Sequence, residues 1–135
     1  MTRDPLLYLE DIIEAIELIE NSMNRKSKAS FFKNRDLQDA IIRRLEIIGE
    51  AIKHLPSGLK VSRAIPWQDV AGMRDILAHA YFNVTLEQVW IVITEDLSLL
   101  KQEVQKIKSS KNRHTKSFFA YVSFYYPRNT NQFKC

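Results

Sequence analysis

The stretch Arg74-Asp75-Ile76-Leu77-Ala78-His79-Ala80-Tyr81 concentrates more chemically active side chains than any other part of the chain. Arg74 is a permanent cation, and His79 is an imidazole that changes its charge near neutral pH. Asp75 adds a carboxylate and Tyr81 adds a phenol. Together these groups could hold an anion and transfer a proton. The alternative is that Arg74 and Asp75 lie on a solvated helix face and that His79 caps the helix.

Helical geometry constrains how these groups can meet. At roughly 100° per residue, Arg74 and Tyr81 share one face of a helix, whereas His79 lies about 140° round from Arg74. The side chains of Arg74 and His79 can converge if the helix loosens near Ala78 and His79. They can also converge if a second copy of the chain supplies the partner across a dimer axis. The motif is therefore better interpreted as half of a site.

Four helices are predicted to position this stretch. The first covers residues 5–23, where Asp4 can cap the start and Pro5 suits the first turn. The second covers residues 36–54 and carries apolar residues at three- and four-residue spacing. The third carries the motif at its C-terminal end, and the fourth runs through residues 86–107.

Local signals mark where these helices begin and where they cross. Thr85 can act as an N-cap with Gln88 completing a capping box, and Val84 can face Val89 as a hydrophobic staple. Gly49 lies inside the second helix, where it costs about 1 kcal/mol relative to Ala. That cost is tolerable if another helix must approach closely. We therefore expect a helix crossing at Gly49.

Two further polar features have structural and functional interpretations. The segment 24–28 is polar and basic, so it is either an exposed connection or a loop that contacts phosphate. His54 stands just before the helix break at Pro56 and is interpreted as a C-terminal residue that interacts with the helix dipole.

Composition favours one soluble, all-α domain. Apolar residues make up 45% of the 135 residues and charged residues 27%, with only three Gly and four Pro. No apolar run approaches the roughly 20 residues that cross a bilayer, and residues 1–4 lead into an acidic amphipathic segment instead of a signal peptide. We expect a cytoplasmic protein. Cys135 is the single cysteine, which excludes an intrachain disulfide and a cysteine-based metal site.

The positive charge of the chain belongs mainly to its C-terminal end. The formal net charge is +4, but residues 1–108 contain 15 Lys and Arg against 16 Asp and Glu. Residues 109–135 add five bases and no acid. Overall charge therefore does not argue that the folded domain binds RNA, and any phosphate site must be local.

The sequence changes character after Lys108. Residues 109–116 have a linker-like composition, and residues 118–126 are aromatic and β-prone. We divide the chain into a helical domain at 1–108 and a basic, aromatic tail at 109–135. The tail could pack on the domain or on a partner, could be loosely ordered, or could stack on single-stranded RNA.

Beyond these physical arguments, the chain resembles the HepT-like toxins of the HEPN superfamily. The motif Arg74-x4-His79-x-Tyr81 carries the resemblance, together with three ordered blocks at residues 8–12, 44–51 and 65–82. The similarity covers residues 4–108. The family often has Asn directly after the motif arginine, where this chain has Asp75, and the tail has no counterpart in the family.

The resemblance implies an antiparallel four-helix bundle that forms a homodimer, with Arg74 and His79 of both copies at a shared cleft. It implies a metal-independent endoribonuclease that needs no cofactor and acts on cellular RNA, either mRNA or tRNA. In this interpretation His79 moves a proton at the ribose 2′-OH or the leaving 5′-oxygen, and Arg74 binds the scissile phosphate. Asp75 is a supporting polar residue that could orient either of them.

The resemblance also implies a partner. Such toxins belong to type VII-like toxin–antitoxin modules in which an MntA-type nucleotidyltransferase transfers AMP onto the motif tyrosine, here Tyr81. An added nucleotide would repel and block RNA beside the cleft. The alternative function is a non-catalytic helical dimer that binds a minimal nucleotidyltransferase or a nucleotide, and a third is a purely structural dimer.

Overall fold

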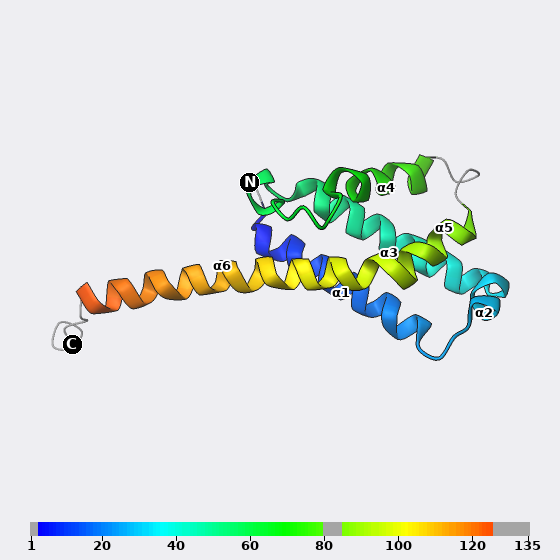
Figure 1. Cartoon of the computed structure of the whole chain (residues 1–135), viewed down its shortest axis with the longest axis horizontal. Coiled ribbons are helices and arrows are strands. Elements are labelled where there is room, and N and C mark those ends of the chain that lie inside the picture. The colour runs from blue at the N-terminus through cyan, green and yellow to red at the C-terminus, as the bar shows by residue number, and fades with distance from the viewer. Residues whose placement is uncertain (1–2, 80–84, 126–135) are drawn as a thin grey trace, which may run out of the picture.

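The chain folds as a bundle of helices (Figure 1). The computed structural model describes the backbone of residues 3–79 and 85–125 and the side chains of residues 3–77 and 85–111. Within these ranges the regular structure is entirely helical and contains no strand. The helices in chain order are α1 (Pro5–Met23), α2 (Lys28–Lys33), α3 (Arg35–His54), α4 (Trp67–His79), α5 (Leu86–Ile91) and α6 (Leu97–Tyr125). The predicted all-α class is confirmed.

The long helices alternate in direction. In Figure 1, α1 and α4 run from left to right, whereas α3 and the arm formed by α5 and α6 run from right to left. The main helix contacts join α1 to α3, α3 to α4, and α1 to α6. α3 therefore has α1 and α4 as its neighbours. This antiparallel order places the C-terminal part of α4, which carries the motif, at the same end of the bundle as the start of α5.

Local capping explains where several helices begin. Asp4 accepts a hydrogen bond from the backbone N–H of Leu6 (2.9 Å) and caps α1, as the sequence predicts. Thr85 caps α5, and both hydrogen bonds of the predicted capping box with Gln88 are formed at 3.2 Å. Val84, the predicted staple residue, lies outside the described residues.

Two local features were not predicted. α2 forms because Ser27 accepts a hydrogen bond from the backbone N–H of Ser30 and because Phe31 is buried in the core. A π-helical segment, Val92–Asp96, joins α5 to α6. Within it, the Thr94 hydroxyl donates to the Trp90 carbonyl at 2.8 Å, and such a back-bond competes with the regular helix ladder.

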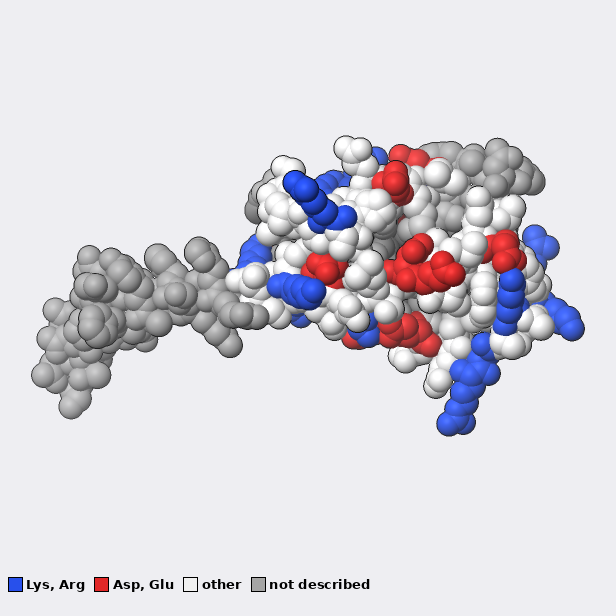
Figure 2. Space-filling view, in the orientation of Figure 1, with Lys and Arg blue, Asp and Glu red and all other residues white. Residues whose placement is uncertain are grey.

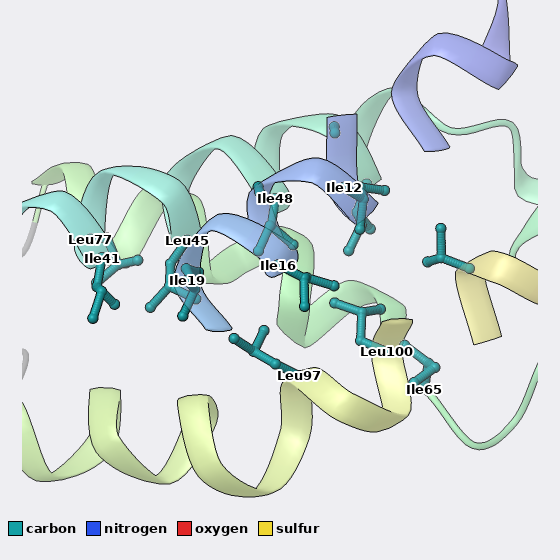
Figure 3. Packing of buried hydrophobic residues seen from close by; sticks show 14 of the residues in the cluster. Ile12, Ile16, Ile19, Ile41, Leu45, Ile48, Ile65, Leu77, Leu97 and Leu100 are labelled. Atoms are coloured by element: carbon teal, nitrogen blue, oxygen red, sulfur yellow. The ribbon is translucent and has the colours of Figure 1, made fainter. Parts of the chain in front are cut away.

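The core lies between α1, α3 and α6 and is built from branched aliphatic side chains. Figure 3 shows side chains of α1, α3 and α6 gathered in the space between these helices: Ile12, Ile16 and Ile19, Ile41, Leu45 and Ile48, and Leu97 and Leu100. Each fully buried side chain of this size contributes roughly 1.5–3 kcal/mol of hydrophobic stabilisation. The fold therefore rests mainly on the packing of these apolar side chains, which on α3 follow the predicted three- and four-residue spacing.

The predicted linker and β-prone segment after Lys108 are wrong as local structure. α6 is helical without interruption from Leu97 to Tyr125. The chain has no Gly or Pro between these two residues, so nothing in the sequence terminates the helix before Pro127. The division of the chain at residue 108 stays a prediction. None of the described helices is both long enough and apolar enough to cross a membrane.

The predicted crossing at Gly49 is confirmed. A Cβ atom placed on Gly49 of α3 would lie 2.8 Å from Cβ of Arg74 and 3.1 Å from its backbone N, both on α4. It would also lie 3.2 Å from the carbonyl oxygen of Val70. These are rigid atoms near a helix backbone, so α3 and α4 could not keep this approach with any larger residue at position 49.

We expect Gly49→Ala to lower the free energy of unfolding by about 1–2 kcal/mol, because overpacking costs about 1–3 kcal/mol and the better helix propensity of Ala offsets up to about 1 kcal/mol. Gly72→Ala is the matched control, since a Cβ at Gly72 of α4 would meet no atom within 4 Å. We expect Gly72→Ala to stabilise the protein. Urea unfolding of both variants measures the difference, and equal effects would contradict the steric account.

Candidate active site on α4

Arg74 leaves α4 at the point where α4 crosses α3, and two carboxylates hold its guanidinium. Nε lies 3.1 Å from Oε2 of Glu50 on α3. Nη1 donates a hydrogen bond to Oδ1 of Asp75 at 3.0 Å. The hydrogen bond with Asp75 and the charge of Glu50 raise the pKa of Arg74 above its usual value, so the side chain is a cation at every relevant pH. The Arg74 side chain remains 36% exposed and can reach a ligand.

Glu50 connects Arg74 to a second group of side chains. Its other oxygen, Oε1, lies 3.0 Å from Nε2 of His54, one helical turn further along α3. The His54 ring stacks on the Tyr8 ring of α1 with centroids 5.3 Å apart and planes 13° apart. The Arg3 guanidinium lies 4.7 Å from the centre of the Tyr8 ring. These contacts link the start of α1, the end of α3 and the middle of α4.

The sequence interpretation did not assign Glu50 a role, although two signals were present. Glu50 directly follows the glycine at the predicted crossing, so its backbone had to lie close to the approaching helix. It also stands four residues before His54, a spacing at which helical side chains meet. His54 was interpreted through the helix dipole alone, and its contacts with Glu50 and Tyr8 are additional to that role.

The predicted partners of Arg74 are described only in part. Asp75 pairs with Arg74, one of the two roles that the sequence left open. His79 is the last residue of α4, but its side chain lies outside the described residues, and so does all of Tyr81. Loosening of the helix near Ala78 and His79 was one of the two ways in which Arg74 and His79 could converge. The backbone is α-helical from Trp67 through His79, so the described helix shows no such loosening. Arg74 and His79 therefore start from different faces of one regular helix.

The chemistry available at the described site is anion binding by a fixed guanidinium. Three carboxylates act on this guanidinium: Glu50 and Asp75 contact it, and Glu46 of α3 adds its negative charge from a longer distance. No group of three or more His, Cys, Asp or Glu side chains that could hold a metal ion occurs in the part of the chain that the structure describes. An anionic ligand would therefore approach Arg74 against the negative field of these three carboxylates.

An apolar groove adjoins the motif helix. It encloses about 380 Å³ between α4 and the arm formed by α5, the π-helical segment and α6. Met73, Ile76 and Leu77 line it from α4, and Val92 lines it from the opposite side. Ile76 is 55% exposed although it lies only two residues after Arg74.

Basic side chains gather at one end of the bundle. Residues 25–35, which connect α1 to α3 and include α2, contain five Lys and Arg and no acid, and all five are exposed. Figure 2 shows Lys and Arg side chains at this end and Asp and Glu side chains across the middle of the same face. Lys28 pairs with Glu87 of α5 at 2.6 Å, which ties the basic segment to the helix that follows the motif.

Comparisons with known proteins agree with one another. The family model described as "Ribonuclease HepT-like" matches residues 12–107. A Thermococcus cleftensis protein named as a probable ribonuclease HepT is 44% identical over 109 residues, which cover 80% of this chain and 99% of that protein. A Caldanaerobacter subterraneus protein named as a candidate RNase is 37% identical over 78% of this chain and 95% of its own length.

A third relative is longer. A Methanocaldococcus jannaschii protein, whose name joins gamma-glutamylcyclotransferase to a candidate RNase, is 46% identical over 90% of this chain. The chain spans 56% of that relative's length. No solved structure gives a significant match.

Proposed function

The chain belongs to the HepT-like ribonuclease family, and on this premise we propose that it is a metal-independent endoribonuclease that acts as the toxin of a type VII-like toxin–antitoxin module. The observation that carries the proposal is the position of Arg74. A guanidinium fixed at a helix crossing and still partly exposed, five residues before a histidine on the same helix, suits a phosphodiester substrate.

The proposed reaction divides the work between two residue types. One His79 accepts the proton of the ribose 2′-OH as the 2′-oxygen attacks phosphorus. A second His79 protonates the 5′-oxygen as its bond to phosphorus breaks, which leaves a 2′,3′-cyclic phosphate and a 5′-OH. Arg74 stabilises the charge that develops on the phosphate oxygens. The exposed bases of residues 25–35 support RNA binding at the same end of the bundle as the start of α5.

The reaction needs two copies of His79, so we also propose a homodimer. Because Arg74 and His79 start from different faces of α4, a second copy is the simplest source of the missing groups. At roughly 100° per residue, positions 76 and 79 lie about 60° apart on α4. Ile76 would then border the histidine face. The apolar groove beside the exposed Ile76 is the surface we assign to the second copy.

One observation favours a second function. Arg74 is already engaged by Glu50 and Asp75, and Glu46 adds to the negative field, which weakens a phosphate site. A non-catalytic helical dimer that binds a minimal nucleotidyltransferase or a nucleotide would tolerate this partial neutralisation. It predicts that the partner still binds when Arg74 is removed and that the protein cleaves no RNA.

RNA cleavage separates these functions. With cellular RNA, including tRNA, in EDTA, we expect wild-type protein to cleave and Arg74→Ala and His79→Ala to lose at least about 100-fold in rate. Expression of the wild type should arrest growth and expression of the variants should not. Arg63→Ala, which removes an exposed arginine elsewhere, should behave as wild type. Wild-type protein that cleaves no RNA in the absence of its partner would contradict the enzyme proposal.

Arg74→Ala should fold. The ion pairs of Arg74 involve side chains that are 36–53% exposed, so solvent screening weakens them. Removal of Arg74 also leaves the buried Oε2 of Glu50 without its counter-charge, so we expect a lower melting temperature. Thermal unfolding checks this, so that a loss of cleavage can be assigned to the site and not to the fold.

The dimer proposal predicts that Ile76→Asp yields a monomer, because a carboxylate in the groove would lose its hydration on association. Val61→Asp is the matched control, since Val61 is 73% exposed and does not line the groove. Sedimentation equilibrium measures the mass of each variant against a chain mass of 15.8 kDa. A monomeric wild type, or a dimeric Ile76→Asp, would contradict this assignment of the interface.

Regulation by adenylylation predicts a mass change at one residue. Incubation with an MntA-type nucleotidyltransferase and ATP should add AMP to the wild type and stop RNA cleavage, whereas Tyr81→Phe should gain no mass. Tyr8→Phe is the matched control. It removes a tyrosine far from position 81 in the sequence, and the variant should still gain AMP. Intact mass spectrometry gives the answer, and AMP addition that persists in Tyr81→Phe would show that another residue is the acceptor.

A further inference from the structure

Glu50 makes a different contact with each of its two oxygens. Oε2 lies 3.1 Å from Nε of Arg74, and Oε1 lies 3.0 Å from Nε2 of His54. Oε2 is buried and accepts no hydrogen bond from any described residue. The charge of Arg74 is therefore what compensates this buried oxygen, because a buried carboxylate oxygen without a counter-charge is costly.

The backbone around this contact leaves little freedom. Glu50 directly follows Gly49, whose missing Cβ lets α4 lie against α3 at Arg74. His54 is held in turn by its stacking on Tyr8 of α1. Three helices thus determine where the Glu50 carboxylate lies, and the carboxylate lies against the Nε edge of the guanidinium.

Because Glu50 occupies the Nε edge of the Arg74 guanidinium, only the other N–H donors of Arg74 can bind a ligand. A guanidinium binds a phosphate through two parallel N–H donors. With Glu50 at Nε, the donors left for such a pair are those of Nη1 and Nη2. Asp75 accepts from Nη1, and Nη2 donates to no described residue. A phosphate would therefore meet the Nη1 and Nη2 end of the guanidinium, while Glu50 stays in place.

We propose that Glu50 is a positioning residue, which fixes the orientation of Arg74 so that its Nη1 and Nη2 donors meet the scissile phosphate. This role rests on the proposed ribonuclease function. Glu50 does not touch the substrate in this arrangement. Its negative charge weakens phosphate binding slightly, and its effect is on the alignment of the guanidinium in the transition state.

Two substitutions of Glu50 test the role. Glu50→Gln keeps an oxygen that can contact Nε but removes the charge, and Glu50→Ala removes both. We expect kcat for RNA cleavage to fall about 10-fold in Glu50→Gln and about 100-fold in Glu50→Ala, with KM unchanged or lower in both. A residue that only supported the fold would lower the melting temperature and would not separate kcat from KM in this way.

Glu46→Gln is the matched control. It removes the same charge one helical turn earlier on α3, where Glu46 pairs with Arg43 at 3.3 Å and reaches Arg74 only through its long-range field. We expect wild-type kcat for this variant. A fall equal to that of Glu50→Gln would show that net charge, and not contact, matters, and would overturn the proposal.

A second measurement is independent of cleavage. The Nε–Hε resonance of Arg74, assigned by its loss in Arg74→Lys, should shift in Glu50→Gln and stay in place in Glu46→Gln. An unchanged resonance, or a Glu50→Gln enzyme with kcat at or above the wild-type value, overturns the positioning role. A wild-type protein that cleaves no RNA overturns the proposed function and this role with it. If the wild-type protein cleaves RNA but the Glu50 variants keep its kcat, only the positioning role of Glu50 is overturned and the proposed ribonuclease function stands.

Discussion

The close approach of α3 and α4 at Gly49 is the constraint on which the candidate site depends. Because Gly49 has no Cβ, the backbone of α4 lies directly against α3 at Arg74. The approach places Glu50 beside Nε of Arg74. A glycine that is unfavourable for the helix is thus the residue that allows the ion pair to form, and the helix-propensity cost of about 1 kcal/mol is offset by packing.

The ion pairs of Arg74 lower its affinity for an anion but favour a single orientation of its guanidinium. Glu50 and Asp75 already neutralise part of the charge of the Arg74 guanidinium, so an arriving anion gains less affinity than it would from an unpaired arginine. The same contacts reduce the number of orientations available to a long, flexible side chain, which favours a single productive geometry. The exposed bases of residues 25–35 lie at the end of the bundle where α5 starts, and none of them contacts Arg74 in the described structure. Long-range attraction of a polyanion and local contact at Arg74 therefore involve different residues.

Much of the fold could be predicted because the signals are local. Apolar residues at three- and four-residue spacing identified the core stripe of α3, and Asp4, Thr85 and Gln88 identified helix starts through side-chain hydrogen bonds within one turn. The errors came where local signals conflict. Aromatic and β-branched residues suggested strand after residue 117, yet the absence of Gly and Pro allowed α6 to continue to Tyr125. The short α2 depends on Phe31 reaching the core, which periodicity within six residues cannot reveal.

The sequence by itself determined the helical class, the existence of a crossing at Gly49, and the incompatibility of Arg74 and His79 with one regular helix face. These follow from spacing, since 100° per residue fixes which positions share a face. Only the tertiary structure decided that Gly49 of α3 meets Arg74 of α4 at the crossing. It also decided that Glu50 contacts His54 and that His54 stacks on Tyr8. Residues 8, 50 and 74 are far apart in the chain, and the burial of apolar stripes on three helices is what brings them together.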